Sequence, residues 1–183
     1  MEENTQKNTQ KKESPFAFIR SVLLTVFVTW FVLNFIIINA NIPSGSMENT
    51  IMTGDRVIGI RLIKDYNRGD IVIFPDPEQE GRYLIKRVIG LPGEKLEISQ
   101  GADGFAEVYI NGSKLSEDYL AEPMLYTGDF EIELPDDGYF MMGDNRNHSY
   151  DARYWERHVI YHDEIIGVAK LRYWPITEIG FLH

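Results

Sequence analysis

The chain has 183 residues, no cysteine and a formal net charge of −10 at pH 7. Without cysteine it has neither disulfides nor thiolate metal ligands. The acidic balance argues against the basic face that nucleic-acid binding requires, so we expect no nucleic-acid partner.

The N-terminal part contains the one long apolar stretch of the sequence. Residues 1–15 are polar and low in complexity, and we expect them to form a disordered cytoplasmic tail. Residues 21–38 carry no charge, and at about 1.5 Å per residue they span about 27 Å as a helix, close to the hydrocarbon thickness of a bilayer. We therefore predict a transmembrane helix within residues 16–39.

Two other interpretations of this stretch fit less well. A cleaved signal peptide has a shorter apolar core with a small-residue exit, and a buried core helix has a polar face. Basic residues up to Arg20 precede the stretch, and the next one is Arg56. The positive-inside rule then places the N-terminus in the cytoplasm and the remainder outside the cell membrane, as in a single-pass type II protein.

Residues 40–183 predict a single extracytoplasmic domain made mainly of β-strands. Pro92-Gly93 favours a type II turn, and Asn111-Gly112 is a strong hairpin signal. Short helices are expected only near 115–121 and 161–164. Apolar and β-branched runs predict strands at 56–62, 70–74, 83–89, 96–99, 107–110, 130–134, 139–142 and 165–174. The fold class is mainly β, an antiparallel, barrel-like or folded-over sheet.

A candidate nucleophile follows the apolar stretch. The sequence Ile-Pro-Ser-Gly-Ser-Met at 42–47 favours a rigid bend that exposes Ser46 and directs backbone N–H groups toward one point. On these residues alone, the pattern favours a plain turn between anchor and domain over a catalytic bend.

Lys86 is the candidate base for that serine. Strand alternation places Lys86 on one face with Leu84 and Val88, where desolvation lowers the pKa of the amine. Arg87 then points to the opposite face, where we expect it in solvent. An ordinary lysine that protects an edge strand is the alternative.

Residues 143–153 form a third unusual block, GDNRNHSYDAR. Its acids, arginines and hydroxyls suggest a buried, fully paired network that holds a loop in one shape. The spacing is not that of an EF-hand, and arginines adjoin both acids, so a metal site is disfavoured.

The three blocks, in this order, resemble the characteristic segments of bacterial type I signal peptidases. The matching segments are Pro43–Met47, Lys86–Gly93 and Gly143–Arg153, and the similarity covers about residues 16–174. A single span without a large insertion is similar to the compact Gram-positive-like members. Asn49, His148 and Ala152 depart from the usual pattern.

The resemblance implies a serine endopeptidase with a Ser–Lys dyad and no cofactor or metal. Ser46 would be the acylating nucleophile, Lys86 the general base, and Ser149 the residue that orients the amine. Ser44 and the Ser46 N–H would donate to the oxyanion. The implied structural network is Asp144, Arg146, Asp151 and Arg153. The implied subsites are lined by Ile42, Pro43, Met47, Ile51, Leu84 and Ile85.

The implied partners are secretory precursors, cut after small-x-small sites, and membrane lipid; we expect a monomer. Three rival interpretations remain. One is a self-cleaving repressor, although its DNA-binding module is missing here. The others are an inactive membrane-anchored β module that binds exported peptides, and a structural sheath or pilus component.

Overall fold

The computed structural model describes residues 15–183, so the predicted polar tail lies outside the described residues except for Pro15. The chain divides after Phe35 into an N-terminal unit and a domain formed by Ile36–His183.

The N-terminal unit is an apolar helix. Helix α1 (Pro15–Phe31) continues as one π-helical turn (Val32–Ile36). The stretch Phe16–Ile36 has a mean hydropathy of 2.1, and this makes it long and apolar enough to span a membrane. Its polar side chains bond to the helix's own backbone: Thr25 Oγ1 donates to Ser21 O at 2.9 Å and Asn34 Nδ2 to Trp30 O at 2.7 Å. This internal pairing suits hydrocarbon, where no water can satisfy polar groups.

The helix ends earlier than the sequence predicted. Residues 37–39, assigned to the span, belong instead to strand β1 (Ile37–Asn41). This strand pairs antiparallel with β2 (Arg56–Ile60), and Ile38 lies opposite Gly59. Ile38 is buried in the core of the domain, so pairing and burial together favour the strand over one more helical turn.

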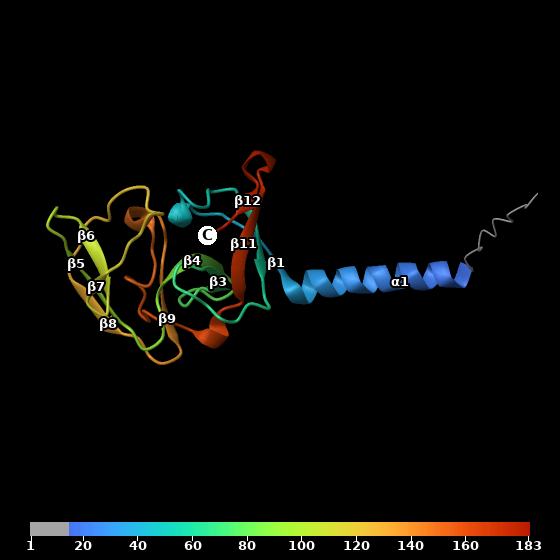
Figure 1. Cartoon of the computed structure of the whole chain (residues 1–183), viewed down its shortest axis with the longest axis horizontal. Coiled ribbons are helices and arrows are strands. Elements are labelled where there is room, and N and C mark those ends of the chain that lie inside the picture. Colours follow the sequence, from blue (N-terminus) through green and yellow to red (C-terminus); the bar gives the residue numbers. More distant parts are fainter. Residues whose placement is uncertain (1–14) are drawn as a thin grey trace, which may run out of the picture. The chain divides into compact units, whose positions relative to one another are not determined.

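Eight strands form the larger sheet of the domain (Figure 1), in the order β1-β2-β11-β3-β4-β9-β10 with β12 beside β11. The remaining bounds are β3 (Ile71–Pro75), β4 (Tyr83–Gly90), β9 (Gly138–Met142), β10 (Ile160–Tyr161), β11 (Gly167–Trp174) and β12 (Gly180–Phe181). All pairs are antiparallel, which confirms the predicted class. In the described residues the sheet is open between β1 and β10, not closed into a barrel.

A second, four-stranded sheet lies at the other end of the domain (Figure 1), in the order β7-β6-β5-β8. Its strands are β5 (Lys95–Gln100), β6 (Ala106–Ile110), β7 (Ser113–Lys114) and β8 (Phe130–Glu133). The hairpin at Asn111-Gly112 is confirmed: both residues have positive φ, 50° and 77°, and Ile110 pairs with Ser113.

Every predicted strand is present, with ends shifted by no more than two residues. The helix expected near 161–164 is the 3₁₀ turn His162–Glu164, whereas 115–121 is an irregular segment. Two further 3₁₀ turns are Arg146–His148 and Ile176–Glu178.

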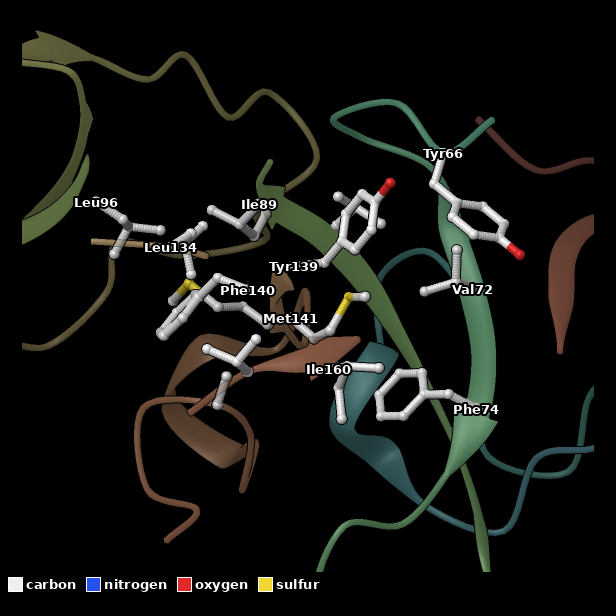
Figure 2. Packing of buried hydrophobic residues seen from close by; sticks show 14 of the residues in the cluster. Tyr66, Val72, Phe74, Ile89, Leu96, Leu134, Tyr139, Phe140, Met141 and Ile160 are labelled. Carbon is white, nitrogen blue, oxygen red and sulfur yellow. The ribbon is translucent and has the colours of Figure 1, made fainter. Parts of the chain in front are cut away.

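The larger hydrophobic core joins the two sheets. Leu96 from β5 and Leu134 after β8 lie close to Phe140 of β9, while Phe74 of β3 packs further along the same core (Figure 2). A smaller cluster fills the space around β1, β2 and β3 and includes Met47. Met47 of the smaller cluster follows Ser46 in the chain, and Val88 of the larger cluster follows Lys86 by two residues.

Candidate active site

Ser46 lies on a single 3₁₀ turn, Gly45–Met47, that follows β1. Met47 and Ile51 anchor this turn because both side chains are fully buried in the smaller core. The N–H groups of Thr50 and Ile51 both donate to Met47 O, at 3.1 and 2.8 Å. Ser46 is thus held on a well-packed turn and is itself 8% exposed.

Strand β4 brings Lys86 to this serine. The Lys86 Nζ lies 2.5 Å from Ser46 Oγ, and Lys86 is 2% exposed. Burial lowers the pKa of Lys86 to about 8, against a smaller opposing effect of the Asp151 carboxylate. At neutral pH roughly one amine in ten is then neutral and able to accept the proton of Ser46.

Arg87 corrects the expectation that it stays in solvent, because it is 1% exposed. Strand β4 has β3 and β9 as neighbours and is covered on both faces from Lys86 onward. Arg87 forms a two-pronged pair with Asp144, Nε to Oδ1 at 2.8 Å and Nη2 to Oδ2 at 2.6 Å. Its guanidinium also lies 4.1 Å from the centre of the Tyr119 ring.

Asp144 therefore connects the block 143–153 to the serine turn. Thr50, which follows the turn that carries Ser46, donates its hydroxyl to Asp144 Oδ2 at 2.5 Å. The carboxylate is 2% exposed and is satisfied by Arg87 and Thr50 together. The segments that carry Ser46 and Lys86 are thus joined by one buried charge network, through Thr50, Asp144 and Arg87.

Asp151 and Arg146 of the same block also have buried partners. Asp151 accepts from the Gly143 N–H at 2.9 Å and from Arg153 Nε at 2.8 Å. Arg146 is buried, donates to Gly143 O at 3.1 Å, and pairs with Glu117 through both terminal nitrogens. These contacts fix the loop around Gly143.

Sequence reasoning missed Arg87, Thr50, Glu117 and Tyr119 as members of this network. The last two lie in the segment 115–121, far from the block in sequence. No local periodicity or motif marks them, because their importance comes only from contact with the buried guanidinium groups of Arg87 and Arg146.

The two predicted supporting serines occupy different environments. Ser44 is exposed and extended, at φ −130° and ψ 154°, just before the turn. Ser149 is 6% exposed, and its Oγ has no hydrogen-bond partner in the described residues 15–183. That hydroxyl lies close to Gly143, as does the Ser46 carbonyl. A buried, unpaired hydroxyl beside the serine turn is costly and requires a reason.

The predicted subsite residues differ in exposure. Ile42, Met47 and Ile51 are buried in the smaller core, whereas Pro43 is exposed and Leu84 and Ile85 are partly exposed. Only the last three keep side-chain surface that a bound chain can reach.

Two histidines of the described residues have structural partners. His158 Nδ1 lies 2.6 Å from Ala152 O, and His162 packs against Tyr66 and Tyr139. Within residues 15–183 no group of three His, Asp or Glu side chains is placed to hold a metal ion.

The family model and the relatives that match this chain are signal peptidases. Residues 16–174 match the model of the family described as "Signal peptidase, peptidase S26". Signal peptidase I of Leptolyngbya laminosa is 36% identical, over 94% of this chain and 86% of that protein. Signal peptidase I of Bacillus licheniformis is 32% identical, over 95% and 96%. A crystal structure of a signal peptidase I from Enterococcus faecalis V583 is 38% identical with a TM-score of 0.49, covering 58% of this chain and 97% of that one.

Proposed function

The chain belongs to the signal peptidase family, peptidase S26, and we propose that it removes signal peptides by acylation of Ser46 with Lys86 as general base. The observation that carries this proposal is the contact between the Lys86 amine and the Ser46 hydroxyl at 2.5 Å, at a site where both residues are buried. Such a contact is what proton transfer between nucleophile and base requires.

The chemistry follows in two halves. Neutral Lys86 takes the Ser46 proton as Oγ attacks the scissile carbonyl carbon, and the resulting ammonium protonates the leaving amine. A water molecule then attacks the acyl carbon while Lys86 accepts its proton; the bond from that carbon to Ser46 Oγ breaks, the carboxyl product leaves, and the Lys86 ammonium returns the proton to Ser46 Oγ. In this proposal the Ser46 N–H and the Ser44 hydroxyl donate to the oxyanion in both halves.

Ser149 has a role in the same proposal. A lysine amine on a flexible stem needs a partner to fix its direction, and a neutral hydroxyl does so without raising the pKa of the amine. The buried and unpaired Oγ of Ser149 supports its assignment as that partner. In this proposal the Ser149 hydroxyl bonds to the Lys86 amine during the reaction.

The proposed substrate surface consists of the exposed or partly exposed apolar residues that precede Ser46 and Lys86 in the chain. These are Pro43, Leu84 and Ile85, whereas Ile42, Met47 and Ile51 are buried. We propose that small residues at the first and third positions before the cut fit this apolar surface.

The apolar helix sets the location. We propose a single-pass protein of the cell membrane, with the N-terminus in the cytoplasm, the β domain outside, and contact with lipid as a monomer. Its substrates are precursors that are themselves tethered by an apolar segment. Holding enzyme and substrate in one membrane raises the effective concentration of the cleavage site.

The test uses purified full-length protein in detergent and a precursor with an Ala-x-Ala site. Ser46→Ala and Lys86→Ala should each abolish cleavage, and the double variant should be no worse than either single one, because the two residues act as a unit. Circular dichroism must show that all three variants are folded. Partial and additive losses would refute the dyad, and replacing His148 by Gln should leave substantial activity.

A further inference from the structure

We propose that Asn145 positions the nucleophile by holding both peptide groups that flank Ser46, and thereby directs the Ser46 N–H toward the oxyanion. The inference rests on the proposed function and names a positioning residue that the sequence did not reveal.

Two hydrogen bonds donated by Asn145 carry this inference. The backbone N–H of Asn145 donates to the Ser46 carbonyl at 3.1 Å. The side-chain Nδ2 of the same residue donates to the Gly45 carbonyl at 3.0 Å. One residue therefore holds the peptide group before the Ser46 Cα and the peptide group after it. Fixing both planes fixes the direction of the Cα–Cβ bond, and with it the position of Oγ.

The bond to Gly45 has a specific consequence for catalysis. The carbonyl of Gly45 and the N–H of Ser46 belong to one peptide group, which is trans, because the cis bond found in residues 15–183 is Trp174-Pro175. In a trans peptide the C=O and N–H point in opposite directions. By holding the Gly45 oxygen on one side, the Asn145 amide therefore turns the Ser46 N–H to the other side.

The turn itself orients this peptide group only relative to its own axis. Glu48 N–H donates to Gly45 O at 3.1 Å, but that bond is internal to the turn and moves with it. Asn145 lies on a different segment and ties the turn to the rest of the domain. An N–H in the first turn of a helix also has no acceptor within that helix, so Ser46 N–H can be aimed at a ligand.

Asn145 is itself held in place by its neighbours. On one side Asp144 is fixed by Arg87, and on the other Arg146 donates to Gly143 O at 3.1 Å. Gly143 has no Cβ, and one at that position would overlap the Ser46 carbonyl. The segment 143–145 can therefore approach the serine turn closely, and the contacts with Arg87 and Arg146 hold it there.

The experiment uses the full-length protein in detergent and the Ala-x-Ala precursor. Asn145→Ala should lower kcat by about 10- to 100-fold, with KM and the pH dependence of the Lys86 limb little changed, because only the transition-state geometry suffers. Ser44→Ala should lower kcat by a smaller factor in the Asn145→Ala background than in the parent protein, since the oxyanion site is already disordered there. Asn145→Asp keeps the shape of the side chain but lacks the Nδ2 donor. If Asn145→Ala fails to fold, Asn145→Asp must show the same loss of kcat.

Asn147 is the matched control. It is also an asparagine of this loop, and its amide bonds to Leu125, Glu122 and Pro123, away from the serine turn. Asn147→Ala should keep kcat near the parent value. Parent-like kcat for both Asn145 variants would overturn the inference, as would a loss of kcat that is additive with Ser44→Ala and moves the pH limb. Full activity of Ser46→Ala would instead refute the proposed function.

Discussion

The buried amine of Lys86 makes a prediction about stability that does not depend on catalysis. Lowering its pKa from 10.5 to about 8 corresponds to about 3 kcal/mol of unfavourable burial for the charged form. The unfolded chain binds the proton more tightly, so the free energy of unfolding rises with pH between about 8 and 10.5. Below pH 8 Lys86 is protonated in both the folded and the unfolded state, so the destabilisation from burying its charge is constant. Above pH 10.5 the amine is neutral in both states, and this destabilisation is absent.

The perturbation is Lys86→Met, which keeps the length of the side chain and removes the titration. The variant and its reference protein both carry Ser46→Ala, so self-cleavage cannot affect the measurement. From pH 7 to pH 9.5 the reference protein, which retains Lys86, should gain about 2 kcal/mol relative to the Lys86→Met variant, as integration of the proton linkage over that interval requires.

Urea unfolding of the two proteins, followed by fluorescence dominated by changes at the buried Trp155, provides the assay. Comparing the two at each pH cancels the titration of every other group. Stability curves that run parallel from pH 7 to 9.5 would refute a lowered pKa for Lys86. In the active protein, kcat/KM should rise about tenfold per pH unit below pH 8 and level off above it.

Two further predictions concern the block 143–153. Gly143→Ala places a Cβ against the Ser46 carbonyl and the Ser149 hydroxyl, so the serine turn must move. We expect kcat for precursor cleavage to fall by at least about 100-fold and the melting temperature to drop. A parent-like kcat would contradict this close packing at Gly143. Ser149→Ala should lower kcat by about ten- to a hundred-fold with little change in KM and no loss of fold, as measured by precursor cleavage and thermal unfolding; parent kcat with an unchanged pH profile would mean that another group orients Lys86.

The sequence alone was sufficient where the signal is local. A long uncharged apolar run specifies a helix because lipid leaves no other way to pair the backbone. Asn111-Gly112 specifies its hairpin because few residue pairs accept positive φ at both positions. The dyad candidates Ser46 and Lys86 were recognisable because each lies in an unusual short segment whose residue types match a known order.

The sequence failed where one strand face is covered by a distant segment. Alternation placed Arg87 opposite Lys86, which is geometrically right, but alternation cannot tell whether that second face meets solvent or protein. Packing buries it against Asp144 and Tyr119. Likewise residues 37–39 continue the apolar run, and only the presence of β2 beside them makes a strand more favourable than helix.

Tertiary structure alone decided how Ser46 is held. Asn145 lies a hundred residues beyond Gly45, and nothing in either local sequence indicates that an amide of one bonds to a carbonyl of the other. A hydrogen bond acts over about 3 Å, whereas a motif reports only on neighbours in the chain. The residues proposed to do the chemistry were therefore readable from the sequence, whereas the contact of Asn145 with the serine turn became visible only in the fold.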